Sequence, residues 1–300
     1  MIMKPAESIM VRLQAIREYK LSPRSEKKIL IVSMLVLVVG VYLSLNDNPN
    51  IQTQIDWRAI AVVMLICVPV TALINALEFI VSARMVGVYF PVFRAMKVTV
   101  IGSAANMLPL PGATMVRILA LKTSGVSFRK GTGITLLLAL IWSGMSFFYA
   151  GVMLQQFDTG MMAWGLGGTG AGVLLASAWM TRYNGARITD YLRLVALKLA
   201  MVLVDAVRIY FCFQALELDV RFFQASAFVV SSVLGSAVSI VPAGLGVREL
   251  VSAGLAPIVG IAASAGFLSA TLNRVTGLAA LLPVAGLLVW LDKEKKGDHS

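Results

Sequence analysis

Histidine and cysteine are nearly missing from this chain, which has one histidine and two cysteines in 300 residues. The histidine, His299, lies in the C-terminal tail, so Ser-His triads and histidine proton relays are excluded, and the sequence offers no metal site. Cys67 and Cys212 both lie inside apolar runs. We expect two small core residues there, because a disulfide framework needs more cysteines in polar loops.

Charge is also scarce, at 14% of residues, whereas soluble domains carry about a quarter. Apolar residues make up 58%, and the mean hydropathy is +0.84. This composition predicts an all-α polytopic membrane protein of the kind found in a bacterial inner membrane. The net charge of +11 is not a nucleic-acid signal, because most basic residues lie at the ends of apolar runs, where they set topology.

Apolar runs of spanning length predict about six full spans in a single transmembrane domain over residues 29–291. These spans are 29–45, 58–81, 133–154, 161–179, 190–213 and 261–291. Residues 1–28 predict a cytoplasmic, basic amphipathic segment, or alternatively a disordered tail, and residues 292–300 a cytoplasmic tail. Pro23 suits the first position of the first helix, and the glycine-rich run after Trp164 suits close helix packing.

Two stretches, 91–121 and 222–259, do not resemble simple spans. They are centred on LPLPGATMVR and VPAGLGVRE, and each has a Pro/Gly break between two short apolar halves. Each half is too short to cross a bilayer comfortably. Broken helices at membrane depth occur inside protein or beside a water-filled cavity, so we predict two re-entrant hairpins.

The two hairpins belong to an internal repeat. An offset of 131 residues superposes PGATMVR on PAGLGVR without a gap, and it relates about 58–154 to about 189–291. The matched pairs are Pro111 and Pro242, Val116 and Val247, Arg117 and Arg248, and Leu119 and Leu250. The hairpins are expected to enter from opposite sides, and such an inverted repeat is typical of secondary transporters.

Positive charges orient the chain. With a cytoplasmic N-terminus and each hairpin returning to its own side, cytoplasmic segments hold 19 of the 26 Lys and Arg residues. The outer loops hold only Arg58 and Arg221. This bias predicts cytoplasmic N- and C-termini and outward-facing loops at 46–57 and 216–221.

Seven charged side chains fall inside apolar stretches, where each costs at least about 2.5–3.5 kcal/mol. They are Glu78, Arg117, Asp205, Arg208, Arg248, Glu249 and Arg274. Static ion pairing is one interpretation: Asp205 with Arg208, Glu249 with Arg274 or Arg117, and Arg248 with Asp205 or Glu78. Lys198 is expected to extend toward a membrane surface.

An anion site is the other interpretation. Arg117 and Arg248 each follow a proline by six residues and are expected near the start of a returning half-helix. Free backbone N–H groups there, with a guanidinium added, suit a phosphate. We therefore predict a phosphate-bearing lipid headgroup bound by Arg117, Arg248, Glu249, Arg208 and Arg274, with Glu78, Asp205 and Glu249 as candidate proton carriers.

The stretch VPAGLGVREL resembles the signature of the lysylphosphatidylglycerol synthase transmembrane-region family, and NMLPLPGATMVRILALKTSGVS resembles that family's first-half loop. The resemblance spans roughly residues 29–291. It rests on Pro242, Gly244, Gly246, Arg248 and Glu249, and more weakly on Pro111, Gly112 and Arg117; Ala243 stands where glycine is usual. The resemblance implies lipid translocation, as by the membrane domain of the multiple peptide resistance factor. We expect no aminoacyl-transferase module here.

Three functions remain open at this stage. A flippase-like transporter could move an anionic phospholipid or a polyprenyl-phosphate-linked sugar. Alternatively, the chain binds lipid as the partner of a membrane glycosyltransferase. The chain could also assemble as a homo-oligomer. An intramembrane lipid-phosphate enzyme is disfavoured, because no His-Ser pair or Asp-rich diphosphate motif is present. The sequence indicates no cofactor and no ATP-binding motif.

Overall fold

The computed structural model describes residues 23–47, 55–106, 112–157, 159–183, 185–237 and 244–297, and all regular structure in these ranges is helical. The N-terminal half comprises α2 (Pro23–Asp47), α3 (Trp57–Val62), the π-helix η2 (Val63–Cys67), α4 (Val68–Met85), α5 (Val92–Ala105), α6 (Gly112–Lys122) and α7 (Phe128–Leu154). The C-terminal half comprises α8 (Gly160–Tyr183), α9 (Ile188–Ala215), α10 (Phe222–Ala227), α11 (Val229–Ala237), α12 (Val247–Leu255), the 3₁₀-helix η4 (Pro257–Val259) and α13 (Ala263–Gly297).

Whereas the sequence predicts about six spans, four helical stretches of the described chain are long and apolar enough to cross a membrane. They are Trp57–Met85, Phe128–Leu154, Gly160–Tyr183 and Ala263–Leu288. The 28-residue α9 has the length of a span, and three charged residues lie in its interior: Lys198, Asp205 and Arg208. The protein is therefore a multi-pass α-helical membrane protein.

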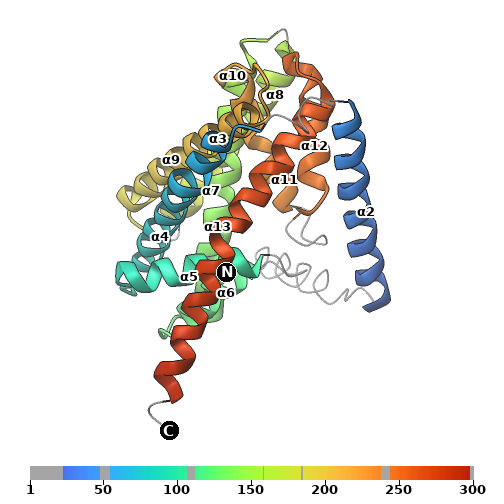
Figure 1. The fold of residues 1–300 in the computed structure, drawn as a ribbon. Coiled ribbons are helices and arrows are strands. Elements are labelled where there is room, and N and C mark those ends of the chain that lie inside the picture. Colours follow the sequence, from blue (N-terminus) through green and yellow to red (C-terminus); the bar gives the residue numbers. More distant parts are fainter. Residues whose placement is uncertain are drawn as a thin grey trace.

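Helix α2 begins at Pro23, as the sequence predicts, and lies at one edge of the molecule (Figure 1). Its apolar side chains, such as Leu35 and Tyr42, are largely exposed, as expected of a helix that faces lipid. Gly40 lets it approach the Phe267 ring on α13 closely, because a Cβ there would collide with that ring. The described residues exclude the basic segment before Pro23, residues 48–54 of the outer loop and the last three residues of the tail.

Helices α7 and α8 pack through glycine, as the glycine-rich run predicts. A Cβ on Gly151 would collide with the backbone of Gly167, and one on Gly170 with the backbone of Phe148. Small residues at these points let the two backbones touch, which is a common way for helices to associate in lipid.

The two Pro/Gly stretches each form a pair of short helices. In the first, α5 packs on α6, and the Asn106 side-chain oxygen accepts a hydrogen bond from the Ala113 N–H at 2.7 Å. In the second, α11 packs on α12, where Gly235 lies against the backbone of Arg248. Residues 107–111 and 238–243, with Pro111 and Pro242, lie outside the described residues.

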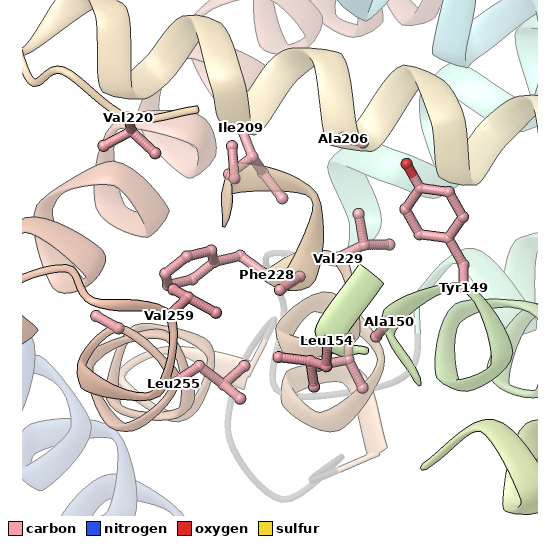
Figure 2. Packing of buried hydrophobic residues seen from close by; sticks show 14 of the residues in the cluster. Tyr149, Ala150, Leu154, Ala206, Ile209, Val220, Phe228, Val229, Leu255 and Val259 are labelled. Carbon is pink, nitrogen blue, oxygen red and sulfur yellow. The ribbon is translucent and has the colours of Figure 1, made fainter. Parts of the chain in front are cut away.

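In Figure 1, α5 and α6 lie at the end nearer the C-terminus, and α10, which precedes α11, lies near the opposite end. The second pair is anchored in an apolar core. Phe228 of the α10–α11 segment and Leu255 of α12 pack there with Leu154 of α7 and Ile209 of α9 (Figure 2). This core fixes the second pair against the long helices that also line the cavity described below.

Candidate functional site: a cationic cavity between two helix pairs

A cavity of about 470 Å³ lies where both helix pairs face α4, α7 and α9. Its volume falls within the range of about 300–1,000 Å³ of small-molecule sites. Its lining side chains come from all of these helices: Thr71 and Asn75 (α4); Thr99, Ser103 and Asn106 (α5 and its end); Ala113, Thr114 and Arg117 (α6); Thr135, Leu138, Ala139 and Trp142 (α7); Lys198, Met201, Asp205 and Arg208 (α9); Ser232, Gly235 and Ser236 (α11); Gly244 and Arg248 (at α12).

Glu78 of α4 anchors the first pair to α9. Its buried carboxylate accepts from Arg117 at 3.0 Å and forms an ion pair with Lys198. Arg117 also donates to the side-chain oxygen of Asn75 at 3.3 Å. One carboxylate therefore pairs with two cations from two other helices. The sequence did not predict this arrangement, because the only ion-pair partner it proposed for Glu78 was Arg248.

Lys198 corrects a second expectation. Its side chain is only 5% exposed and is directed to Glu78, with the ammonium 5.9 Å from the centroid of the Trp142 ring. It therefore does not extend to a membrane surface. The buried carboxylate on α4 stabilises the ammonium inside the protein, and no pattern within α9 reveals that neighbour.

The second pair is held by Glu249 and Arg274. The buried Glu249 carboxylate pairs with Arg274 of α13 at 2.9 Å and accepts from the Gly246 N–H at 2.9 Å. Arg274 also donates to the Gly244 carbonyl at 3.0 Å. Of the two partners expected for Glu249, Arg274 is the one found, and together they fix the turn that leads into α12.

Asp205 and Arg208 pair within α9, as their spacing predicts. The N–O distance is 3.6 Å, and Arg208 further donates to the Asn273 carbonyl of α13 at 3.3 Å. Both residues line the cavity, so the pair is a self-balanced part of the wall.

Arg248 is the exception, because its guanidinium makes no hydrogen bond and no ion pair with any residue that the structure describes. The expectation that Asp205 or Glu78 would pair with it is wrong: Asp205 faces Arg208, and Glu78 faces Arg117 and Lys198. Arg248 lies in the first turn of α12 and lines the cavity. It therefore presents an unshared cation to that space.

The predicted equivalence of Arg117 and Arg248 holds in one respect and fails in another. Both line the same cavity, one from each helix pair. Arg248 is the second residue of α12, whereas Arg117 lies more than one turn into α6, so only Arg248 stands at a half-helix start. Residues 244–246 form a separate turn before α12, and this shifts the helix start relative to the first pair.

The predicted site residues therefore fall into two groups. Arg117, Arg208, Arg248 and Asp205 line the cavity, whereas Glu78, Glu249 and Arg274 are not among its lining residues and act through ion pairs behind it. Sequence reasoning missed the uncharged wall, in particular Thr99, Trp142 and Ser232. Single hydroxyls and one indole in apolar helices give no signal until the fold places them round one space.

Among the described residues, four cations and one carboxylate line the cavity, and the carboxylate is paired with Arg208. Glu78 balances part of this charge from behind. The remaining cation, Arg248, is a planar donor suited to a phosphate or carboxylate oxygen. The arrangement can bind an anion within the membrane domain.

Residues 180–285 match the model of the family described as Lysylphosphatidylglycerol synthase TM region. The match covers α9 to most of α13, including the second helix pair with Arg248, Glu249 and Arg274. It confirms the resemblance predicted from VPAGLGVREL and indicates a function related to membrane lipids. No curated protein matches the chain.

Proposed function

We propose that this protein is a flippase-like lipid translocase that moves a phosphate-bearing anionic lipid across a cell inner membrane. The observation that carries the proposal is Arg248, an unshared cation in a cavity formed by both helix pairs. A buried, unbalanced cation is costly, and a lipid phosphate entering the cavity offsets that cost. The family match supports a lipid as the ligand.

The predicted inverted repeat is a second argument for transport, and the element boundaries are consistent with its offset of 131 residues. Shifted by 131 residues, α5 falls on 223–236, within the α10–α11 segment, and α4 with α3 falls on α9. α6 and α7 likewise fall close to α12 and α13. Two similar units of opposite orientation round one site provide a route to alternating access from the two membrane faces.

We place both termini on the cytoplasmic side, from the distribution of positive charge. The lipid tails would stay in the bilayer while the headgroup passes between Arg248 and Arg117. Asp205 is the carboxylate that lines the cavity, and it is the residue we favour for any proton coupling.

Reconstitution into liposomes tests the proposal. Arg248→Ala should lower the transfer of a fluorescent anionic phospholipid at least tenfold, and Arg248→Lys should also be impaired, because an ammonium does not reproduce the two-pronged geometry. Arg193→Ala is the matched control, since Arg193 is exposed and pairs only with Asp190.

Transfer at the normal rate by Arg248→Ala would overturn the assignment of the site. If the wild-type protein binds the lipid but transfers none, the alternative of a lipid-binding partner of a membrane glycosyltransferase is favoured over a translocase.

A further inference from the structure

Five side chains that line the cavity have a buried polar atom without a hydrogen-bond partner among the described residues. They are Thr99 (Oγ1), Trp142 (Nε1), Arg208 (Nε), Ser232 (Oγ) and Arg248 (Nε). A buried polar group that is left unpaired destabilises the folded protein, because it has given up its hydrogen bonds to water. These atoms are fully buried beside the cavity, so a ligand in it completes their hydrogen bonds when the side chains turn toward it.

Three of these five groups are uncharged. Thr99 of α5 and Ser232 of α11 each offer a hydroxyl that donates and accepts, and Trp142 of α7 offers an N–H that only donates. They come from three helices, including both helix pairs. Asn75 and Ser236 add further neutral polar side chains to the wall. This part of the cavity suits a neutral group with several hydroxyls.

The charges exclude a cationic headgroup. Asp205 is the one carboxylate among the lining residues, and Arg208 already pairs with it. Glu78 and Glu249 lie behind the wall and are occupied by Arg117, Lys198 and Arg274. An amino group brought into the cavity would find no free anion and would meet several cations.

We propose that the transported headgroup is a phosphate diester joined to an uncharged polyol, either a glycerol or a sugar, and not an aminoacylated or other amine-bearing headgroup. This inference rests on the proposed function and names its substrate class. Arg248 binds the phosphate, and the subsite of Thr99, Trp142 and Ser232 binds the hydroxyls.

Lipid binding to the purified full chain, measured by native mass spectrometry, tests the proposal. The decisive pair is phosphatidylglycerol and phosphatidylmethanol with the same acyl chains, because both carry one negative phosphate and only the first has hydroxyls. We expect phosphatidylglycerol to bind about two- to tenfold more tightly, the worth of one or two hydrogen bonds. Lysyl-phosphatidylglycerol should bind more weakly than either.

A second pair, the methyl and hexosyl diesters of a polyprenyl phosphate, distinguishes the two sources of such a headgroup, because both members carry one negative charge. A preference for the hydroxylated member of either pair supports the proposal, and the pair with the larger preference identifies the source. Equal affinities within both pairs would overturn the polyol subsite and leave the phosphate site intact. Lysyl-phosphatidylglycerol binding as tightly as phosphatidylglycerol would overturn the charge argument.

Substitutions separate this inference from the proposed function. Trp142→Phe should reduce the preference for the hydroxylated lipid, weakening phosphatidylglycerol binding more than phosphatidylmethanol binding, and Trp164→Phe, at an exposed position on α8, is its control. Arg248→Ala should weaken both lipids. Unchanged binding of every lipid by Arg248→Ala would refute the proposed site itself, whereas an equal loss of both lipids in Trp142→Phe would refute the polyol subsite alone.

Discussion

At the scale of single residues, the buried charges divide into ion pairs and one charge, Arg248, that has no partner among the described residues. Glu249 and Arg274 satisfy each other and the turn before α12, and Asp205 and Arg208 balance each other within α9. Burying such pairs is of little net benefit, but removing one member leaves an uncompensated charge. Arg248, which has no such partner, is therefore the residue at which a ligand changes the charge balance most.

Glu78 is the residue whose loss should destabilise the fold most. Glu78→Gln leaves Arg117 and Lys198 without their shared carboxylate, and we expect a loss of about 3–5 kcal/mol, read as a lower midpoint of thermal unfolding in detergent. The double variant Glu78→Gln/Lys198→Met should recover part of that loss, since it removes one of the two stranded charges.

The matched control is Asp190→Asn, which breaks the exposed ion pair with Arg193. It should change stability by no more than about 1 kcal/mol, because solvent screens that pair. If Glu78→Gln lowers the midpoint of thermal unfolding no more than Asp190→Asn does, the ion pairs of Glu78 do not hold α6 and α9 against α4.

Much of the charge pattern was predictable residue by residue, and the remainder shows where sequence reasoning stops. The i, i+3 spacing predicted the Asp205–Arg208 pair, because helix geometry alone brings those side chains together. The partner of Lys198 depends on which face of α9 meets α4, and that is decided by packing between distant segments. For the same reason, the sequence assigned Arg248 a partner that it does not have.

At the scale of elements, the turn before α12 is the most constrained backbone near the site. Gly244 has φ +62° and Gly246 has φ +82°, a region that suits glycine. A Cβ at Gly244 would also collide with the Gly235 carbonyl of α11. The glycines of VPAGLGVRE therefore follow from a turn that must pass against α11 and still place Arg248 in the cavity.

Gly244→Ala should consequently disturb the second helix pair. We expect a stability loss of well over 1 kcal/mol and reduced lipid binding, because both the left-handed backbone and the contact with Gly235 oppose the new methyl group. Thermal unfolding and native mass spectrometry measure the two effects.

Gly254 in α12 provides the comparison for that variant. No atom lies within 4 Å of a Cβ placed there, so Gly254→Ala should be neutral or slightly stabilising. If the Gly244→Ala protein has the same midpoint of thermal unfolding as the Gly254→Ala protein and binds lipid normally, the turn tolerates a side chain and does not position Arg248.

The elements themselves were largely predictable, since hydropathy and Pro/Gly punctuation carry them. The predicted span at 190–213 is α9 at Ile188–Ala215, and the predicted break in 91–121 separates α5 from α6. In the second stretch, the break between α11 and α12 was predicted, but the division of its first half into α10 and α11 and the short helix η4 were not. Pro257 begins η4 and Gly260, with its left-handed backbone, ends it.

At the scale of the whole molecule, one cavity shared by two helix pairs is the feature that connects fold to transport. Thr114 lines it from α6 and Ser236 from α11. If the pairs open alternately, their separation must change during each transfer, because a polar path open at both ends would leak ions. A bridge between Thr114 and Ser236 positions should therefore trap one state.

Cysteines at these two positions, in a background with Cys67 and Cys212 replaced by alanine, allow bridging with bifunctional thiol reagents of graded length. We expect a reagent short enough to span the cavity to stop lipid transfer in liposomes while native mass spectrometry still detects bound lipid. Cysteines at Ser103 and Thr114 are the control, since they bridge α5 to α6 within one pair and should leave more transfer intact.

Efficient bridging of Thr114 to Ser236 with undiminished transfer would leave the cavity as a binding site and rule out alternating movement of the two pairs. Transfer stopped equally by both bridges would indicate that movement within the first pair, and not between the pairs, carries the lipid.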